Sequence, residues 1–117
     1  MEYFGQCHCQ AVQFSFNSEL INSALQCNCS ICRRKNLIMS LTRIASEHFT
    51  ILAGKDNLAL YLWGDHDVNH YFCKTCGVSP FSDINCEPFG YRINLGCVDS
   101  LDLTQLSITH FDGRNEL

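Results

Sequence analysis

The sequence has no surplus of basic residues. It contains 8 Lys and Arg residues against 12 Asp and Glu residues, which gives a net charge of -4. A protein that neutralises phosphate backbones needs a broad basic surface, so this balance argues against nucleic acid as a partner. Only 17% of the residues are charged and 46% are hydrophobic. This composition is typical of a globular chain, and we expect a single domain over residues 1–117.

The chain also lacks long apolar segments. No run approaches the ~20 residues that a membrane-spanning helix requires, so we expect no membrane partner. The N-terminal residues contain no basic region followed by an apolar run, which is the pattern of a secretory signal. The sequence therefore favours a cytoplasmic protein, in which thiols stay reduced.

Cysteine, by contrast, is abundant. The nine cysteines are an odd number, which argues against a fully paired disulfide framework. Closely spaced reduced cysteines are typical of metal sites, and zinc is the metal that we expect. Cys27, Cys29 and Cys32 lie within six residues of one another and form the predicted three-cysteine site. Three protein ligands leave one position of a tetrahedral ion for water or a substrate atom, which is typical of a reactive site.

Two further pairs of cysteines predict a second zinc site. Cys7 and Cys9 are separated by one residue, and alternate residues of an extended chain point the same way. Cys73 and Cys76 form a Cys-x-x-Cys turn followed by Gly77, whose backbone freedom suits a tight metal-binding turn. These four thiolates predict a closed tetrahedral site, the four-cysteine site, that joins two distant parts of the chain.

Four other side chains compete for metal-binding or acid-base roles. Strand alternation turns His8 away from its neighbouring cysteines, so we expect it not to be a ligand. His66 lies between two Asp residues, and we expect it to be an exposed loop residue. We expect Cys86 and Cys97 to be lone thiols, although either of them could complete the three-cysteine site.

The hydrophobic pattern predicts a mostly β fold. Short segments in which apolar residues alternate or cluster predict strands at residues 12–16, 20–26, 37–41, 49–52, 58–63, 68–73, 91–95 and 107–111. Pro80 before Phe81 predicts an edge strand, because proline cannot donate to a ladder. The stretch 83–90 is expected to be an irregular loop that covers a site.

Three cysteine blocks carry a resemblance to a known family. They are residues 5–9 (Gly-Gln-Cys-His-Cys), 27–33 (Cys-Asn-Cys-Ser-Ile-Cys-Arg) and 72–77 (Phe-Cys-Lys-Thr-Cys-Gly). The segments 91–97 and 111–115 look similar too. On these motifs the chain resembles the glutathione-dependent formaldehyde-activating enzymes and the related centromere protein V domain. The resemblance implies several small coiled antiparallel sheets held together by two zinc ions.

The same resemblance implies different roles for the two ions. One ion is structural in the family, and its ligands here would be Cys7, Cys9, Cys73 and Cys76. The other ion is assigned to chemistry, and its ligands here would be Cys27, Cys29 and Cys32. The family's named reaction joins formaldehyde and glutathione into S-(hydroxymethyl)glutathione, which is formally a carbon-sulfur lyase reaction run in reverse. This chain has Asn28 where family members often carry His, so the resemblance does not supply a His-assisted proton transfer at that position.

Two functions are compatible with these features. The first is a zinc-dependent carbon-sulfur lyase-type enzyme that acts on an adduct of a small aldehyde and a thiol such as glutathione. Arg33 and Arg34 directly follow the three-cysteine site, and we expect them to bind a carboxylate of the substrate. The alternative is a non-catalytic binding module for a protein partner. In that case both zinc ions only stabilise the fold, and Cys86 or Cys97 completes the three-cysteine site.

Overall fold

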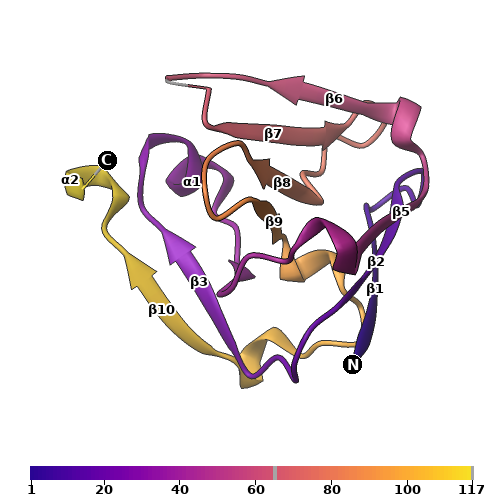
Figure 1. The fold of residues 1–117 in the computed structure, drawn as a ribbon, viewed down its shortest axis with the longest axis horizontal. Helices are drawn as coiled ribbons and strands as arrows, with labels where there is room; N and C mark the ends of the chain where they lie inside the picture. Colours follow the sequence, from indigo (N-terminus) through magenta and orange to yellow (C-terminus); the bar gives the residue numbers. More distant parts are fainter. Residues whose placement is uncertain (65, 117) are drawn as a thin grey trace.

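The computed structural model describes residues 1–64 and 66–116, and in this part of the chain short strands form three small sheets (Figure 1). The first sheet has the order β1 (Glu2–Gln6), β2 (Gln13–Asn17) and β5 (Phe49–Ala53). The second has the order β10 (Ser107–Phe111), β3 (Ser23–Cys27) and β4 (Met39–Ser40). The third has the order β6 (Leu58–Tyr61), β7 (Val68–Cys73), β8 (Phe81–Ile84) and β9 (Gly90–Ile93).

The helical elements are all short. They comprise α1 (Ser30–Lys35), α2 (Gly113–Glu116) and single 3-10 turns at Ser46–His48, Lys55–Asn57, Leu95–Cys97 and Leu103–Gln105. None of the described helices is long and apolar enough to cross a membrane. The prediction of a mostly β fold made of several small sheets is therefore confirmed.

One strand pairing departs from the antiparallel pattern. β3 and β10 run side by side in the same direction, with Ser23 opposite Ser107 and Cys27 opposite Phe111 (Figure 1). Parallel neighbours need a long connection between them, and here most of the chain lies between β3 and β10. The C-terminal strand thus supports the strand that ends at the first ligand of the three-cysteine site.

The prediction of an edge strand at Phe81 is wrong. β8 lies inside the third sheet, because it pairs with β7 on one side and with β9 on the other. Pro80 precedes the strand, so its missing N–H is not needed by the ladder. Its carbonyl oxygen accepts a hydrogen bond from the Asn94 N–H at 3.0 Å.

The first strand was not predicted. In β1 the residues alternate between exposed and buried positions, and Tyr3 and Gly5 point inward. Gly5 lies opposite Phe14 of β2. A side chain at this position would clash with the Phe14 ring, so glycine allows the ring to lie across the edge strand.

Aromatic side chains join the first and third sheets in the main core. The rings of Phe49 in β5 and Tyr91 in β9 stack with centroids 3.9 Å apart and an interplanar angle of 11°. Phe14 of β2 meets Phe81 of β8 edge-on at 5.3 Å. Aromatic pairs with these geometries add to the free energy gained from burying their area. The main core therefore fixes how two of the sheets pack.

A second, smaller core lies under the three-cysteine site. It contains Cys27, Cys29 and Met39, which are at most 8% exposed. Partly buried hydrophobic side chains pack against it, namely Leu25, Ile31, Leu37 and Phe111, together with Cys32. The three thiols therefore belong to a hydrophobic cluster that is separate from the main core.

Candidate metal centres

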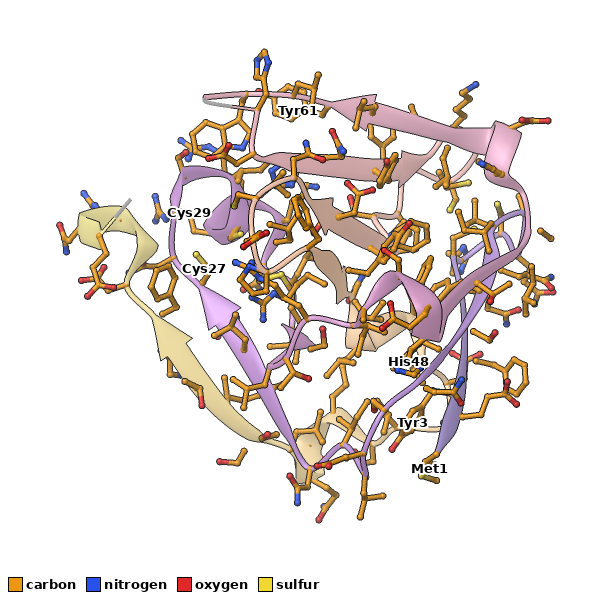
Figure 2. All side chains as sticks on the ribbon, viewed as in Figure 1. Met1, Tyr3, Cys27, Cys29, His48 and Tyr61 are labelled. Atoms are coloured by element: carbon orange, nitrogen blue, oxygen red, sulfur yellow. The ribbon has the colours of Figure 1, made fainter. Side chains whose placement is uncertain are left out.

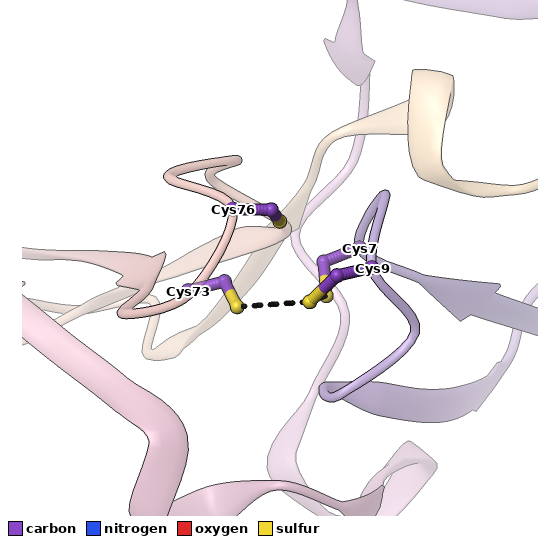
Figure 3. A group of neighbouring side chains, drawn as sticks. All are labelled: Cys7, Cys9, Cys73 and Cys76. Atoms are coloured by element: carbon purple, nitrogen blue, oxygen red, sulfur yellow. Dashed lines mark hydrogen bonds between the residues drawn. The ribbon is translucent and has the colours of Figure 1, made fainter.

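The four-cysteine site joins the first sheet to the third. Cys7 and Cys9 come from the loop that connects β1 to β2, Cys73 is the last residue of β7, and Cys76 lies in the turn that follows (Figure 3). All four sulfurs lie within 4.8 Å of one another. The Cys7 and Cys9 sulfurs are 3.7 Å apart, and the Cys9 and Cys73 sulfurs 3.6 Å apart. A tetrahedral zinc ion with Zn–S distances of ~2.3 Å separates its sulfurs by ~3.8 Å, so these four residues fit zinc.

Hydrogen-bond donors surround the sulfurs of this site. The Val12 N–H donates to Cys7 Sγ at 3.3 Å, and Asn57 Nδ2 donates to Cys73 Sγ at 3.2 Å. Main-chain N–H groups, that of Cys76 first, outweigh the opposing effect of burial and lower the pKa of the Cys73 thiol to about 6. Because thiolates are the metal-binding form of cysteine, these donors favour an ion at this site.

The three-cysteine site lies where β3 meets α1 (Figure 2). Cys27 is the last residue of β3, Cys29 is the N-cap of α1, and Cys32 lies within α1. Their sulfurs are also within 4.8 Å of one another. The Cys29 N–H donates to Cys27 Sγ at 3.4 Å. The helix is short because Asn36 ends it in the left-handed conformation, with φ of 54°.

The three thiols differ in acidity. Burial raises the pKa of Cys27 and of Cys32. Burial also opposes ionisation of Cys29, but hydrogen bonds from the Cys32 main chain and from the neighbouring thiols outweigh it and lower the Cys29 pKa. These hydrogen bonds therefore favour the thiolate form of Cys29, the form that binds a metal.

The structure separates Cys86 and Cys97. Cys97 is buried in the main core, where burial and the nearby Cys7 and Cys76 sulfurs raise its pKa to about 12. It thus lies beside the four-cysteine site and does not join the other three sulfurs. Cys86 is exposed in the loop after β8, and it lines the same cavity as the three-cysteine site. Among the described residues, neither thiol belongs to either metal group.

The two histidines considered from the sequence lie outside both groups. His8 is exposed between its neighbouring cysteines, and the metal-binding geometry does not include it. His66 is exposed in the loop between β6 and β7, where its N–H donates to the Trp63 carbonyl oxygen at 3.1 Å. Neither side chain contributes to a site in the described structure.

Two cavities meet at Cys29. The large cavity, about 620 Å³, is lined by all three cysteines of the site. The small cavity, about 380 Å³, is lined by Cys29, Asn28, Arg33, Arg34 and Arg114, among others. Two of the lining residues, Cys29 and Trp63, are common to both cavities. A ligand in either cavity would therefore contact the same tryptophan.

The predicted carboxylate-binding residues line only the small cavity. Arg33 and Arg34 lie on α1, and Arg34 Nη1 donates to the Ser30 carbonyl oxygen at 2.8 Å. The next residue of the basic run, Lys35, lines the large cavity instead. The helical turn thus divides the three consecutive cations between two cavities.

Sequence reasoning missed three basic residues of the large cavity: Arg43, His70 and Arg92. Arg43 and Arg92 lie far apart in the sequence, and only the fold brings them together. The sequence contained a partial indication for Arg92. Side chains alternate along a strand, so burial of Ile93 places Arg92 on the opposite face of β9. No local pattern marks His70 within its strand.

Similarity to known proteins agrees with this geometry. A family model described as glutathione-dependent formaldehyde-activating enzyme matches residues 2–112. The chain belongs to this family. A crystal structure of a Rhodobacter sphaeroides protein has a TM-score of 0.76 to this fold and 28% sequence identity. The match covers 91% of this chain and 99% of that one. The matched residues 2–112 include all the cysteines of both sites.

Asn28, between the first two cysteines of the three-cysteine site, binds the C-terminal segment. Its Nδ2 donates to Asp112 Oδ1 at 3.0 Å, and its Oδ1 accepts a bond from the Arg114 N–H at 2.9 Å. Both amide atoms are therefore occupied. The residue holds α2 against the small cavity of this formaldehyde-activating family member.

His70 is held neutral beside the three-cysteine site. Burial, and then the charge of Lys35, lower its pKa to about 4. Its Nε2 accepts a hydrogen bond from Trp63 Nε1 at 3.1 Å, which leaves the ring proton on Nδ1. The contact fixes the orientation of the indole that this family member places between its two cavities.

Proposed function

We propose that this protein is a zinc-dependent carbon-sulfur lyase-type enzyme that acts on thiol-aldehyde adducts similar to S-(hydroxymethyl)glutathione. Membership of the formaldehyde-activating family supports this general activity. The observation that carries the proposal is the position of the three-cysteine site on the wall of the large cavity. A small thiol or aldehyde that enters the cavity meets these sulfurs directly. The reduced thiols suit a cytoplasmic location.

In the synthetic direction, a bond forms between the thiol sulfur and the aldehyde carbon. The carbonyl π bond opens, and the thiol proton ends on the new hydroxyl oxygen. The lyase direction reverses each of these changes. Cys27, Cys29 and Cys32 would hold a zinc ion, which would supply Lewis acidity and lower the pKa of a thiol that reaches it. Met39 and Phe111 would give the substrate an apolar surface beside these sulfurs.

Arg33 and Arg34 are proposed to bind a carboxylate of glutathione in the small cavity. Both line it next to Cys29, and arginine forms paired hydrogen bonds with a carboxylate. The four-cysteine site is proposed to be structural, because its four sulfurs complete a tetrahedron and connect two sheets. Its ion has no position left for a substrate.

Replacement of one sulfur tests this division of roles. We expect Cys29→Ser to abolish formation of S-(hydroxymethyl)glutathione from formaldehyde and glutathione, and to release one zinc per chain. The remaining zinc should keep the protein folded, as measured by circular dichroism. Cys86→Ser is the matched control, because it removes an exposed thiol of the same cavity. If Cys29→Ser kept its turnover, the three-cysteine site would not be catalytic.

A non-catalytic, zinc-stabilised module that binds a protein partner is the second candidate. The observation that favours it is Cys86, which lines the large cavity on a loop. Closure of this loop would supply a fourth sulfur to the ion. In that case Cys86→Ser would lose one zinc per chain and no aldehyde chemistry would be found. Retention of two zinc ions by Cys86→Ser would favour the enzyme.

A further inference from the structure

Two arginines face each other on the wall of the large cavity. Ile44 and Tyr91 form an antiparallel bridge, with reciprocal N–H to O hydrogen bonds of 2.8 Å and 2.7 Å. In such a ladder the next pair outward has its side chains on one face and close together. That pair is Arg43 and Arg92, and both line the large cavity. Like charges placed opposite each other destabilise adjacent strands.

Close approach of the two segments depends on Gly90. A Cβ atom added there would lie 2.8 Å from the Ile44 carbonyl oxygen and 3.2 Å from Arg43 Cβ. Real side chains do not tolerate such contacts with a main-chain atom. Glycine at the start of β9 therefore allows the Arg43 segment to pack against this strand.

The guanidinium groups of Arg43 and Arg92 donate hydrogen bonds to main-chain carbonyl oxygens. Arg92 Nη1 donates to Ser40 O at 2.9 Å and to Leu41 O at 2.7 Å. Arg43 Nη1 donates to Pro88 O at 2.6 Å. Carbonyl oxygens orient a guanidinium without cancelling its charge. Each guanidinium has five N–H donors, so both keep donors for a ligand.

The protein keeps these charges at an energetic cost. Burial first, and then repulsion by Arg43, lower the pKa of Arg92. Lys35 on α1 lines the same cavity, and burial lowers its pKa as well. Asp67 is the acidic residue among those that line the cavity, so the lining carries more cations than anions. An anionic group placed between the arginines would offset this excess and satisfy their free donors.

The wall of the cavity near the three sulfurs is apolar. Leu25, Leu37, Met39 and Phe111 line it there. A ligand that spans from the arginines to the sulfurs would therefore pass along an apolar surface, with a charge at one end only. Such a ligand gains from burial of its carbon chain.

We propose that Arg43 and Arg92 form a carboxylate-binding site in the large cavity, which selects organic acids with an apolar segment next to the carboxylate. This inference rests on the proposed function in one respect: the carboxylate that binds there would belong to the thiol substrate of the enzyme. The binding itself requires no reaction. Because the small cavity holds its own arginines, the two cavities would take different carboxylates.

The single tryptophan of the chain reports on this site. Trp63 lines the large cavity, and the sequence contains one Trp. Titration of the zinc-loaded protein with hexanoate should change its fluorescence. Hexanamide, which has the same chain without the charge, should bind about tenfold more weakly, because charge-assisted hydrogen bonds are lost. Equal affinities for the acid and the amide would overturn the proposal.

Variants separate the arginines from general charge effects. Arg43→Met should weaken hexanoate binding about tenfold and leave hexanamide binding unchanged. Arg92→Met should weaken hexanoate binding in the same way. If that variant does not fold, Arg92→Lys replaces it, because it keeps the positive charge. Arg92→Lys should also bind hexanoate more weakly, because lysine cannot form paired hydrogen bonds with a carboxylate. Lys55→Met, which removes an exposed cation outside both cavities, should bind hexanoate like the parent. Unchanged binding by both arginine variants would contradict the proposal.

The titration also distinguishes this proposal from the proposed function. Hexanoate contains neither a thiol nor an aldehyde, so its binding is independent of turnover. Selective binding of hexanoate by a protein that never acts on aldehyde adducts would support the arginine site and reject the lyase activity. Turnover without selective binding of hexanoate would reject the arginine site alone.

Discussion

The two cysteine sites use the same chemistry with different connections to the fold. The four-cysteine site takes two sulfurs from the loop between β1 and β2 and two from the end of β7 and the turn after it, so an ion there would cross-link distant parts of the chain. The three-cysteine site takes all its sulfurs from one short segment and borders a cavity. An ion that joins two sheets stabilises the fold, whereas an ion held by one segment leaves the fold nearly unconstrained. The connections of a site, more than its ligand type, therefore indicate its role.

The largest effect should follow removal of a sulfur from the four-cysteine site. Cys73→Ser is expected to release one zinc and to lower the free energy of unfolding by about 3 kcal/mol or more, because the link between two sheets is lost. Thermal unfolding and elemental analysis would measure both changes. Cys86→Ser is the control, since that thiol is exposed and outside both groups. A fully stable Cys73→Ser protein would remove the distinction between the two sites.

Gradual removal of zinc should affect the sites in sequence. A chelator is expected to take the ion from the three-cysteine site first, because three ligands hold it and the cavity gives access to it. Activity should therefore disappear with the first equivalent of zinc, while circular dichroism remains that of the folded protein. Loss of both ions in one step, together with unfolding, would show that the sites do not differ in this way.

An asparagine next to each site provides a finer comparison. Asn57→Ala removes hydrogen bonds from Nδ2 to Cys73 Sγ and to Thr75 Oγ1, at 3.2 Å and 3.1 Å. We expect it to lower the free energy of unfolding by about 1 kcal/mol and to leave turnover unchanged. Denaturant unfolding and a steady-state assay measure the two effects. A fall in kcat with unchanged stability would contradict this expectation.

Asn28→Ala should act in the opposite way. It removes the two hydrogen bonds that hold Asp112 and Arg114 against the small cavity. Because these contacts shape the cavity and do not join sheets, we expect KM for glutathione to rise about threefold, which corresponds to less than 1 kcal/mol, with little change in stability. Asn28→Asp keeps an acceptor for the Arg114 N–H but places a second carboxylate next to Asp112, so it should raise KM at least as much as alanine does. An unchanged KM in Asn28→Ala would show that the small cavity does not bind glutathione.

The smallest effect concerns pH. Hydrogen bonds from Asn115 and then from Asn28 lower the pKa of Asp112 below its ordinary value of 3.8. A carboxylate with a lowered pKa in the folded state stabilises its contacts fully above that ordinary value, and the contribution is lost as the pH falls through the folded pKa. The side-chain amide signals of Asn28 in NMR spectra should therefore shift below pH 4. An Asp112→Asn variant should not show this transition.

Local spacing predicted the clustered sulfurs because the three-cysteine site, and each pair of the four-cysteine site, consists of near neighbours in the sequence. A two-residue or three-residue separation fixes where cysteines point, whichever strands pair around them. The strand at 107–111 was also predicted correctly, since its apolar pattern is local. To predict that Cys7 and Cys9 share a site with Cys73 and Cys76, one further assumption was enough, namely that the two pairs of cysteines come together in the fold.

Pairings between distant strands could not be predicted in this way. Three features depend on contacts between segments that are far apart in the sequence. They are the interior position of β8, the parallel pairing of β3 with β10, and the proximity of Arg43 to Arg92. The residues of a strand indicate which of its faces is buried, but they do not indicate which strands pair with it. The large cavity lies between such distant segments, so the sequence identified its three sulfurs and missed most of its wall.

The parallel contact between β3 and β10 also bears on how the protein matures. The ribosome makes residues 7–76 before it makes the strand at Ser107–Phe111. All four sulfurs of the four-cysteine site are therefore available while the neighbour of Cys27 is still missing, and Asn28 waits for a partner 84 positions later, at Asp112. On the proposed division of roles, an ion at the four-cysteine site can be bound during synthesis, whereas the three-cysteine site reaches its final shape only after Phe111 and Asp112 have emerged.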